Sequence, residues 1–442
     1  MKQLVGLVIL CAAASWASIG GADNYANNFI YFQSDYVRDP KFCWDPHIPT
    51  SESFLARLAA KLQPGEHFDV RSMAAVHSVL FLAFYYPLLL LLRPLSLVPR
   101  IALALIALWI FADTGTVALF NSYFADVAAI LGGLAMTVLA VHLLKVDKIG
   151  HAALLVFGLA ALLFVTSKTP HAIAGIVPLA FVAVLVFRSK DLAIRITAGV
   201  IAVALIAGMT WVLTTTPDWY LAQARFNLVF FKITPRDPAG APQDLRQLGL
   251  GDADLRYVGL NAYMANSPMI DPKWADAFAA RCTQSSVIGF YLHHPATALS
   301  FLWSDMSAGA ERRQKNLSNF RREAGQPAGA QSYRFATWSL LRSWLFDLWP
   351  PHILIWYLFV LAALPVLAWR DPSRYRRAIA GVIAAISVMG AVEYALASLP
   401  DACETHRHML LFHIFTDAAI FLVLVYAASR FERARAAAPQ PS

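Results

Sequence analysis

The sequence predicts an all-α polytopic membrane protein with about ten transmembrane helices and a small extracytoplasmic domain. Of its 442 residues, 58% are hydrophobic and 14% are charged, whereas soluble domains have about 45–50% and about 25%. Several apolar runs approach the roughly 20 residues that cross a bilayer. These proportions exclude a soluble enzyme. The formal net charge of +8 does not indicate a nucleic-acid partner, because the cations cluster beside the apolar runs.

The first apolar run, residues 4–19, is short, and Ser15-Trp16-Ala17 resembles a cleavage site. Residues 1–21 are therefore either a first transmembrane helix or a signal peptide. In both cases Asp23 and the residues after it emerge outside the membrane. We assign residues 22–73 to an extracytoplasmic segment.

Nine further apolar runs follow, and we expect each of them to cross the membrane. The runs lie at 74–92, 99–118, 125–144, 151–166, 172–187, 194–213, 350–369, 377–397 and 408–428. The first six form a predicted helix bundle over residues 74–213, and the last three occupy residues 349–429.

Basic residues between alternate runs set the predicted orientation. If the runs alternate in direction, these residues all fall on one side, which the positive-inside rule identifies as the cytoplasm. They are Arg93, Arg100, Lys145, Lys148, Arg188, Lys190, Arg195, Arg370, Arg374, Arg376 and Arg377. Residues 430–442 add a basic cytoplasmic tail.

The longest outer segment, residues 214–348, is too long for a plain loop and predicts a small folded domain. Its apolar stretch at 287–303 is broken by His-His-Pro at 293–295. Proline removes a backbone donor and bends a helix, so we expect an interfacial helix there and not a span. An oxidising compartment would permit a disulfide between Cys43 and Cys282; the alternative is that both remain thiols.

Polar residues gather at the outer ends of the runs. Ionisable side chains are costly in hydrocarbon, so they suggest a functional site at this face. The candidates are Asp23, Asp113, Asn121, Ser122, Tyr123, Asp126, Lys168, His171, Glu404, Arg407 and His408. Structural alternatives exist for each cluster. Asn121 or Asp126 could cap the next helix, Lys168 could extend to the interface, and Glu404 with Arg407 could form an ion pair.

Metal and nucleotide motifs are weak or missing in the sequence. Cys403, His406 and His408 are suitable zinc ligands, but no second pair at finger spacing completes a site. No metal site is therefore predicted, although the sequence is compatible with a divalent cation. GxGxxG, P-loop and GxSxG strings are absent, which argues against nucleotide-driven chemistry.

A signal-like first helix ending in an acidic residue, many further spans and a late outer domain together resemble the GT-C class of membrane glycosyltransferases. Those enzymes use polyprenyl-phosphate-linked sugars and place an acidic base just after the first transmembrane helix. The resemblance assigns this role to Asp23. A second acidic group after the third span is also typical of the class, and Asp113 or Asp126 matches it.

Shorter strings resemble elements of bacterial hexose-transferase-like membrane proteins of surface-glycan pathways. Residues 121–126 look like their NSFYxE element, residues 167–171 like SKxQH, and residues 404–408 like ExxRH. The stretch from Phe226 to Leu250 resembles the opening of their outer domain.

The chain departs from these patterns at two positions and lacks a third feature. Asp126 stands where Glu is expected, and Pro170 stands where Gln is expected. No DxD string follows Asp23, so metal dependence stays open.

The resemblance implies transfer of a sugar from a polyprenyl-phosphate donor to an extracytoplasmic envelope or surface-glycan acceptor. Such a transfer needs a base for the acceptor hydroxyl and cations for the leaving phosphate. The implied catalytic residues are Asp23, Asp113 and Asp126. The implied phosphate ligands are Lys168, Arg407 and Arg225. The residues implied to bind substrate are Asn121, Ser122, Tyr123, His171, Glu404 and His408.

The implied location is the bacterial inner membrane, with several spans and an active face directed outward. The implied partners are the lipid-linked sugar, a glycan or lipid acceptor and membrane lipids, without nucleic acid.

Two rival functions are a transporter or flippase for an envelope lipid and a non-catalytic envelope-assembly protein. Polar residues in mid-span and repeated halves with broken helices would favour a transporter. The spans are expected to be apolar through their centres, with Glu393 and His142 as the ionisable exceptions, and no internal repeat is visible. The enzyme is therefore the favoured reading.

Overall fold

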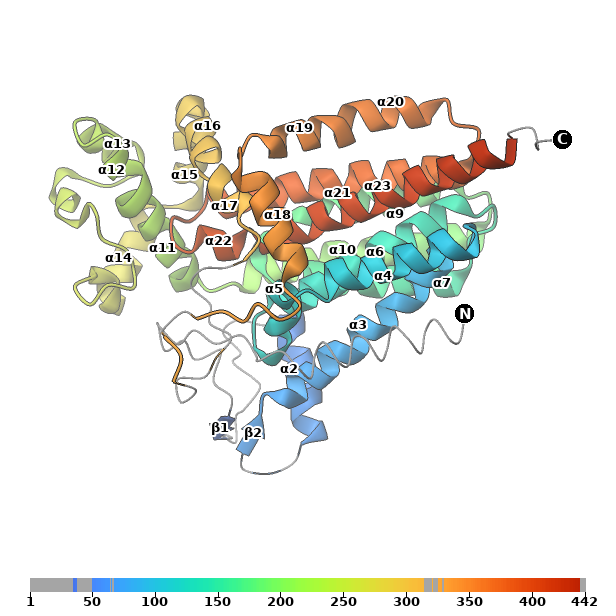
Figure 1. Cartoon of the computed structure of the whole chain (residues 1–442). Coiled ribbons are helices and arrows are strands. Elements are labelled where there is room, and N and C mark those ends of the chain that lie inside the picture. The colour runs from blue at the N-terminus through green and yellow to red at the C-terminus, as the bar shows by residue number, and fades with distance from the viewer. Residues whose placement is uncertain are drawn as a thin grey trace.

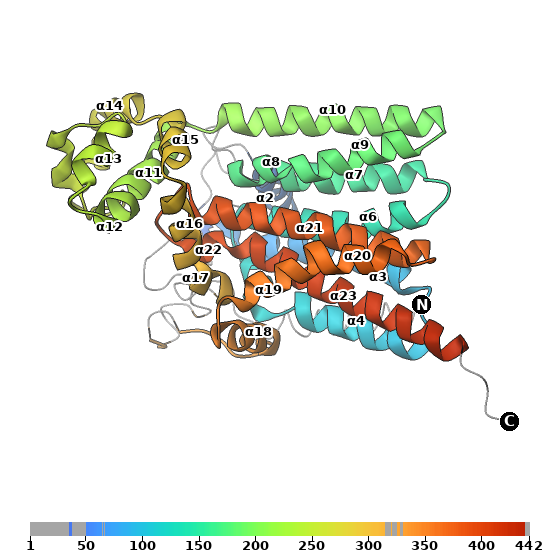
Figure 2. The same ribbon diagram turned by 90° about the horizontal axis from the view of Figure 1, so that it is seen from above.

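The computed structural model describes residues 35–37, 50–63, 65, 67–313, 320, 325–327 and 330–437. It is almost entirely helical, with one short antiparallel strand pair, β1 (Asp35–Val37) with β2 (His67–Asp69), among the described residues. Long helices run side by side in a bundle, and a group of shorter helices forms a lobe at one end of it (Figures 1 and 2). The chain is therefore consistent with an all-α polytopic membrane protein.

The bundle contains the helices expected from the apolar runs. Its elements are α3 (Arg71–Leu92), α4 (Leu97–Phe111), α6 (Asp126–Lys145), α7 (His151–Val165), α8 (Thr169–Ala174), α9 (Ile176–Arg188), α10 (Leu192–Thr215), α19 (His352–Leu358), the π-turn η7 (Phe359–Ala363), α20 (Leu364–Trp369), α21 (Arg374–Ser398) and α23 (Leu410–Ala437). In the described part of the chain, seven helices are long and apolar enough to span a membrane.

Two of the expected spans differ from a plain helix. Residues Leu97–Phe111 and Thr114–Asn121 form a pair bent by 48°, which makes an eighth span if the pair crosses together. His151–Val165 is apolar but short. The first apolar run lies outside the described residues, so the total of about ten spans stays a prediction.

Helix α6 lies at the centre of the bundle. Of its apolar 18-residue stretch, 83% is buried, whereas for the corresponding stretch of α10 the share is 22%. It packs on α3, α7, α21 and α23. Glycines allow this close contact: a Cβ on Gly132 would lie 2.5 Å from the Ala160 carbonyl oxygen of α7, and one on Gly133 would lie 3.1 Å from Phe415 of α23. Small residues at such positions bring helix backbones together within a membrane.

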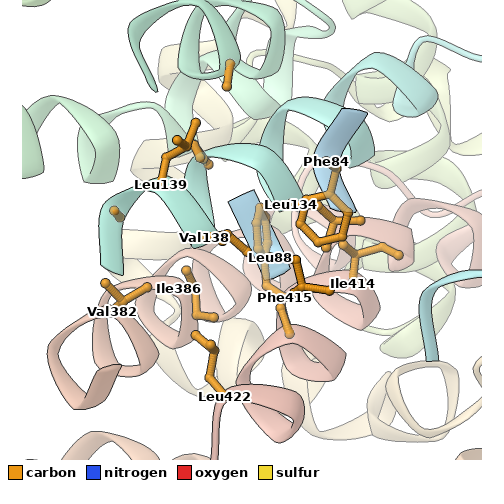
Figure 3. Close-up of a cluster of buried hydrophobic side chains, with 14 of the residues drawn as sticks. Phe84, Leu88, Leu134, Val138, Leu139, Val382, Ile386, Ile414, Phe415 and Leu422 are labelled. Atoms are coloured by element: carbon orange, nitrogen blue, oxygen red, sulfur yellow. The ribbon is translucent and has the colours of Figure 1, made fainter. Parts of the chain in front are cut away.

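Apolar side chains from α3, α6, α21 and α23 fill the space around α6 (Figure 3). The residues labelled there are Phe84, Leu88, Leu134, Val138, Leu139, Val382, Ile386, Ile414, Phe415 and Leu422. Because lipid tails are as apolar as these side chains, tight packing holds the helices together.

The basic connections meet at the end of the bundle away from the lobe. Lys145 donates to the Leu90 carbonyl at 3.2 Å, and Arg188 donates to the Val146 carbonyl at 3.2 Å. Arg374 pairs with Asp147, and its Nε donates to the Leu144 carbonyl. The predicted grouping of cations on one side is therefore present in the fold.

The lobe consists of α11 (Asp218–Asn227), the π-turn η3 (Leu228–Ile233), α12 (Thr234–Arg236), α13 (Ala241–Gln247), η4 (Asp252–Tyr257), η5 (Pro268–Ile270), α14 (Pro272–Arg281), α15 (Gln284–His293) and α16 (Pro295–Ser304). Aromatic rings form its core. Trp274 stacks on Phe278 with ring centres 5.4 Å apart, and Phe226 meets both rings edge-on. This separate core extends from Ala222 to Phe301.

The break expected at the His-His-Pro string is present, because α15 ends at His293 and α16 begins at Pro295. Cys282 is a free thiol that is fully buried in the lobe core. The expected bond to Cys43, which itself lies outside the described residues, is thus not supported. Burial raises the pKa of the Cys282 thiol to about 11, which makes it a poor nucleophile for disulfide exchange.

The remaining elements cover the lobe end of the bundle. They are α2 (Ser51–Leu62), α5 (Thr114–Val117), the 3₁₀ turn η2 (Ala118–Asn121), α17 (Met306–Ala310), α18 (Thr337–Asp347) and α22 (Thr405–His408). Helix α2 is held by a buried pair in which His77 Nε2 lies 2.8 Å from Glu52 Oε1. Helix α18 packs against α4 through Trp338 and Trp109, whose ring centres lie 5.2 Å apart.

The predicted orientation can be tested by cysteine labelling of the two ends. Ala253 on the lobe and Lys190 at the basic end are both exposed. We expect Ala253→Cys to react with a membrane-impermeant maleimide in intact spheroplasts, above the background of the parent chain. Lys190→Cys should react only after lysis. The reverse pattern would place the lobe in the cytoplasm and overturn the orientation.

Candidate functional site

Three of the polar clusters noted in the sequence meet at the lobe end of the bundle. Asp126 is the first residue of α6, while Lys168 is the N-cap residue of α8 and His171 lies within α8. Pro170, which departs from the resembled pattern, stands in the first turn of α8, where a missing N–H costs nothing. Residues 404–408 add α22, which packs on α21 and α23.

His171 lies between two buried carboxylates. Its Nδ1 is 2.8 Å from Glu393 Oε1, and its Nε2 is 3.4 Å from Asp126 Oδ1. Lys168 Nζ lies 3.5 Å from the same Asp126 oxygen. His171, Asp126 and Glu393 are each less than 5% exposed. An imidazolium donates from both ring nitrogens, so one protonated ring can satisfy both carboxylates.

Glu393 joins this cluster although it was not among the candidate site residues. It lies near the C-terminal end of α21, on the side of the lobe, and accepts from His171. An ionisable residue inside an otherwise apolar span is the signal that could have identified it.

The α22 segment contributes a second pair of charges. Arg407 Nη2 lies 2.6 Å from Glu404 Oε2, so the predicted ion pair is present, and the guanidinium lies 5.1 Å from the centre of the Phe124 ring. Arg407 also interacts electrostatically with Asp126. Partial burial and the neighbouring Lys168 and Arg407 cations lower the pKa of His408.

Glu404 begins α22 with φ 56° and ψ 31°, a left-handed backbone conformation. Such a conformation is uncommon outside glycine and persists only where the surrounding structure holds it. Here the Arg407 ion pair holds the side chain, and the Arg407 and His408 amides both donate to the Glu404 carbonyl.

The lobe approaches the cluster from the other side. Asn227 of α11 donates to Asp401 Oδ1 at 3.1 Å and accepts from the Ala262 amide at 2.7 Å. Tyr220 and Tyr263 are close enough to Arg407 to interact electrostatically. The polar residues therefore lie where the lobe and the bundle meet. We name them the α6–α8–α22 cluster, which consists of Asp126, Lys168, His171, Glu393, Glu404, Arg407 and His408.

The string that precedes α6 has a largely structural part. Ser122 is fully buried, and its hydroxyl donates to the Leu119 carbonyl at 2.5 Å. Tyr123 packs on Phe68 with ring centres 5.9 Å apart. Neither Asn121 nor Asp126 caps α6, because the N-cap residue is Ala125 without a side-chain bond. The capping alternative is therefore wrong, and Asn121 retains a buried Oδ1 without a hydrogen-bond partner among the described residues.

Like Asn121, Ser122 and Tyr123, the predicted site residues Arg225 and Asp113 do not belong to this cluster. Asp23 lies outside the described residues. Arg225 is buried in the lobe, where its electrostatic partners are Cys282 and Asp218. Asp113 accepts from the Gly115 amide at 2.8 Å and the Ser339 amide at 3.0 Å, and so it caps α5 and ties that helix to α18.

A second buried network surrounds Asp417 in α23. Its carboxylate lies 2.9 Å from Arg312 Nε and 3.0 Å from Arg342 Nε. Arg342 also donates to His413 Nδ1 at 2.6 Å, and Arg312 donates to Thr116 at 2.7 Å. All four of the charged or imidazole side chains are at most 1% exposed.

Asp417 and His413 correct the expectation that Glu393 and His142 are the only ionisable residues inside the spans. The sequence signal was present, since Asp417 lies inside the last apolar run. Its partners Arg312 and Arg342 come from a distant segment, and only the fold brings them to it.

No group of three or more His, Cys, Asp or Glu side chains is placed to hold a metal ion in the described part of the chain. The suggested zinc ligands diverge: His406 lies 3.2 Å from Glu311, whereas His408 lies near Lys168.

A family model described as the YfdI N-terminal transmembrane domain matches residues 17–440. The chain therefore belongs to this family of transmembrane domains. No curated protein and no solved structure matches the chain.

The Asp417 network predicts a strong dependence of stability on one carboxylate. Asp417→Asn keeps the shape of the side chain but leaves two buried guanidiniums without a counter-charge, so we expect a loss of about 3–5 kcal/mol in unfolding free energy. Asp252→Asn is the matched control, because Asp252 pairs with Arg246 on the exposed surface and its loss should change stability by at most about 1 kcal/mol. Denaturant unfolding in micelles measures both; equal effects would contradict the buried pairing.

Proposed function

We propose that this member of a transmembrane-domain family transfers a sugar from a polyprenyl-phosphate donor to an extracytoplasmic envelope or surface-glycan acceptor. The observation that supports the proposal most is the α6–α8–α22 cluster. Three segments that separately resemble elements of hexose-transferase-like proteins contribute its charges: Lys168 Nζ lies 3.5 Å from Asp126 Oδ1, and Arg407 interacts electrostatically with the same carboxylate.

The reaction balances without a nucleotide. A base takes the proton of the acceptor hydroxyl, the acceptor oxygen forms a bond to the anomeric carbon of the sugar, and the bond from that carbon to the phosphate oxygen breaks. The bonding electrons leave with the lipid phosphate, which gains negative charge. Preorganised cations stabilise that charge most where water is excluded.

Lys168 is the proposed phosphate ligand. Its ammonium has three donors, and the single contact to Asp126 at 3.5 Å is long for a charge-assisted bond. The side chain is 15% exposed, so it borders the buried cluster and not its centre. Arg407, held by Glu404 and the Phe124 ring, supplies a second cation at a fixed position.

Asp126 is better suited to hold a substrate hydroxyl than to remove its proton. Lys168 and His171 already stabilise its ionised form, and a carboxylate stabilised as an anion is a weak base. The proposed base therefore remains Asp23, with Asp113 and Asp126 as the other candidates. The proposal places the cluster and the lobe on the outer face of the bacterial inner membrane.

A transporter or flippase for an envelope lipid is the second candidate function. The buried Asp417 carboxylate, which lies in the last span and pairs with Arg312 and Arg342, favours it, because charges inside membrane spans often mark substrate pathways. Sugar transfer by the purified chain in detergent micelles separates the two functions, since micelles have no second compartment to which a lipid could move.

The base is tested by Asp23→Asn, which keeps the size of the side chain but cannot accept the proton. General bases contribute on the order of 10²–10⁴-fold, so we expect transfer to fall by that factor while donor binding is retained. The assay uses purified chain with a polyprenyl-phosphate sugar. Wild-type turnover in this variant would make Asp23 a loop residue and direct the same test to Asp113 and Asp126.

The phosphate ligand is tested by Lys168→Ala. A hydrogen bond to a charged group contributes about 1.5–3 kcal/mol, so the KM for the lipid-linked donor should rise at least about tenfold, with partial recovery in Lys168→Arg. Lys190→Ala, an exposed lysine at the opposite end of the bundle, is the control and should not change the KM. An unchanged donor KM in Lys168→Ala would remove this residue from the donor site.

A further inference from the structure

Two chain breaks that the proposed transfer site does not use meet in the lobe and line a polar cavity that is open to solvent. One is the proline-containing turn between α12 and α13, and the other is the His-Pro break between α15 and α16. The cavity has a volume of about 200 Å³. Its lining residues are Ile233, Arg236, Asp237, Gly240, Gln243, Asp244, His294 and Thr297. We name it the lobe cavity.

The walls of the lobe cavity are fixed by contacts between lining residues and by contacts to residues behind them. Arg236 donates to Thr297 Oγ1 at 2.7 Å, and its guanidinium lies 5.8 Å from the Phe301 ring centre. His294 stacks on Phe290 at 4.6 Å and bonds Gln247 through Nε2 at 2.6 Å. Side chains held in this way lose little conformational entropy when a ligand binds.

The turn between α12 and α13 closes on the Asp237 side chain. Asp237 accepts from the Gly240 amide at 3.2 Å, and a Cβ on Gly240 would lie 2.6 Å from Asp237 Oδ2. Glycine therefore lets the turn close on its own carboxylate and orients Asp237 at the edge of the cavity. Asp244 lies within reach of the Asp237 charge, and burial together with that charge raises the pKa of Asp244.

The charges of the lining exclude several ligand classes. Two carboxylates beside one guanidinium oppose an anion such as phosphate. The guanidinium opposes a metal ion, and no cluster of three metal-binding side chains exists among the described residues. Ile233 is the one aliphatic side chain in the lining, so an apolar ligand would leave most of the polar groups unpaired.

A neutral polyhydroxylated ring meets the remaining requirements. Carboxylates accept from hydroxyl groups, while guanidinium and amide groups donate to them. The volume of about 200 Å³ accommodates one monosaccharide ring. Binding sites of this kind combine a concave shape with a few convergent polar groups.

We propose that the lobe cavity binds one sugar residue of the glycan acceptor, apart from the α6–α8–α22 cluster. This proposal rests on the proposed sugar transfer for the identity of the glycan as acceptor. Its lining residues belong to α12, α13, α16 and the adjoining turns, and these helices lie in the lobe beyond the end of the bundle (Figures 1 and 2). A glycan held there by one residue keeps its concentration high near the site where another residue reacts.

Binding is measured directly, without donor and without turnover, so that failure of the transfer reaction does not affect the result. The full chain in micelles is probed by saturation-transfer NMR with methyl α-glucopyranoside, methyl α-galactopyranoside and N-acetylglucosamine. Asp244→Ala and Arg236→Ala are the cavity variants, and Asp252→Ala, an exposed lobe carboxylate outside the cavity, is the control. Lys168→Ala, which alters the proposed donor site, shows whether the sugar binds at that site or in the lobe cavity.

We expect at least one of these sugars to bind, with affinity reduced at least tenfold in both cavity variants and unchanged in Asp252→Ala and Lys168→Ala. The proposal is overturned if none of the sugars binds, if the cavity variants bind like wild type, or if only Lys168→Ala loses the signal. Thermal midpoints are compared first, and Gln243→Ala replaces a cavity variant that has lost stability.

Discussion

The close approach of α6 to α7 and α23 is the contact on which the candidate site depends. Gly132 and Gly133 permit it, because any side chain at either position would meet the backbone of α7 or the ring of Phe415. Helix α7 leads directly into Lys168 and α8. A wider spacing of α6 and α7 would therefore move Lys168 away from Asp126, at the start of α6, and dismantle the cluster.

Pairing of buried charges is the second constraint, and it connects the two networks. Within α22, His406 reaches Glu311, which precedes Arg312 of the Asp417 network, while Arg407 interacts with Asp126 of the other. Removing one member of a buried pair leaves its partner charged and unsolvated. Helix α22 and the residues around Arg312 are thus held to the bundle by electrostatic interactions as well as by apolar contacts.

The fold was predictable where a single local property decides it. The expected run at 125–144 corresponds to Asp126–Lys145, and the break expected at residues 293–295 separates α15 from α16. The bend after Phe111 was not expected, because the run at 99–118 was predicted to form one helix although it contains Asp113. Asp113 produces it by capping a new helix while accepting from Ser339, which lies more than two hundred residues away in the chain.

The sequence by itself determined the membrane class, the positions of the apolar helices and the grouping of cations at one end, since hydropathy and charge distribution are properties of local composition. It also placed Asp126, Lys168 and Arg407 at the same face. Only the tertiary structure decided their partners. Glu393 contacts His171, and Arg312 and Arg342 contact Asp417. A buried charge pairs with whichever opposite charge the packing of the helices brings within a few ångströms. The separation of two residues in the sequence carries no information about this packing.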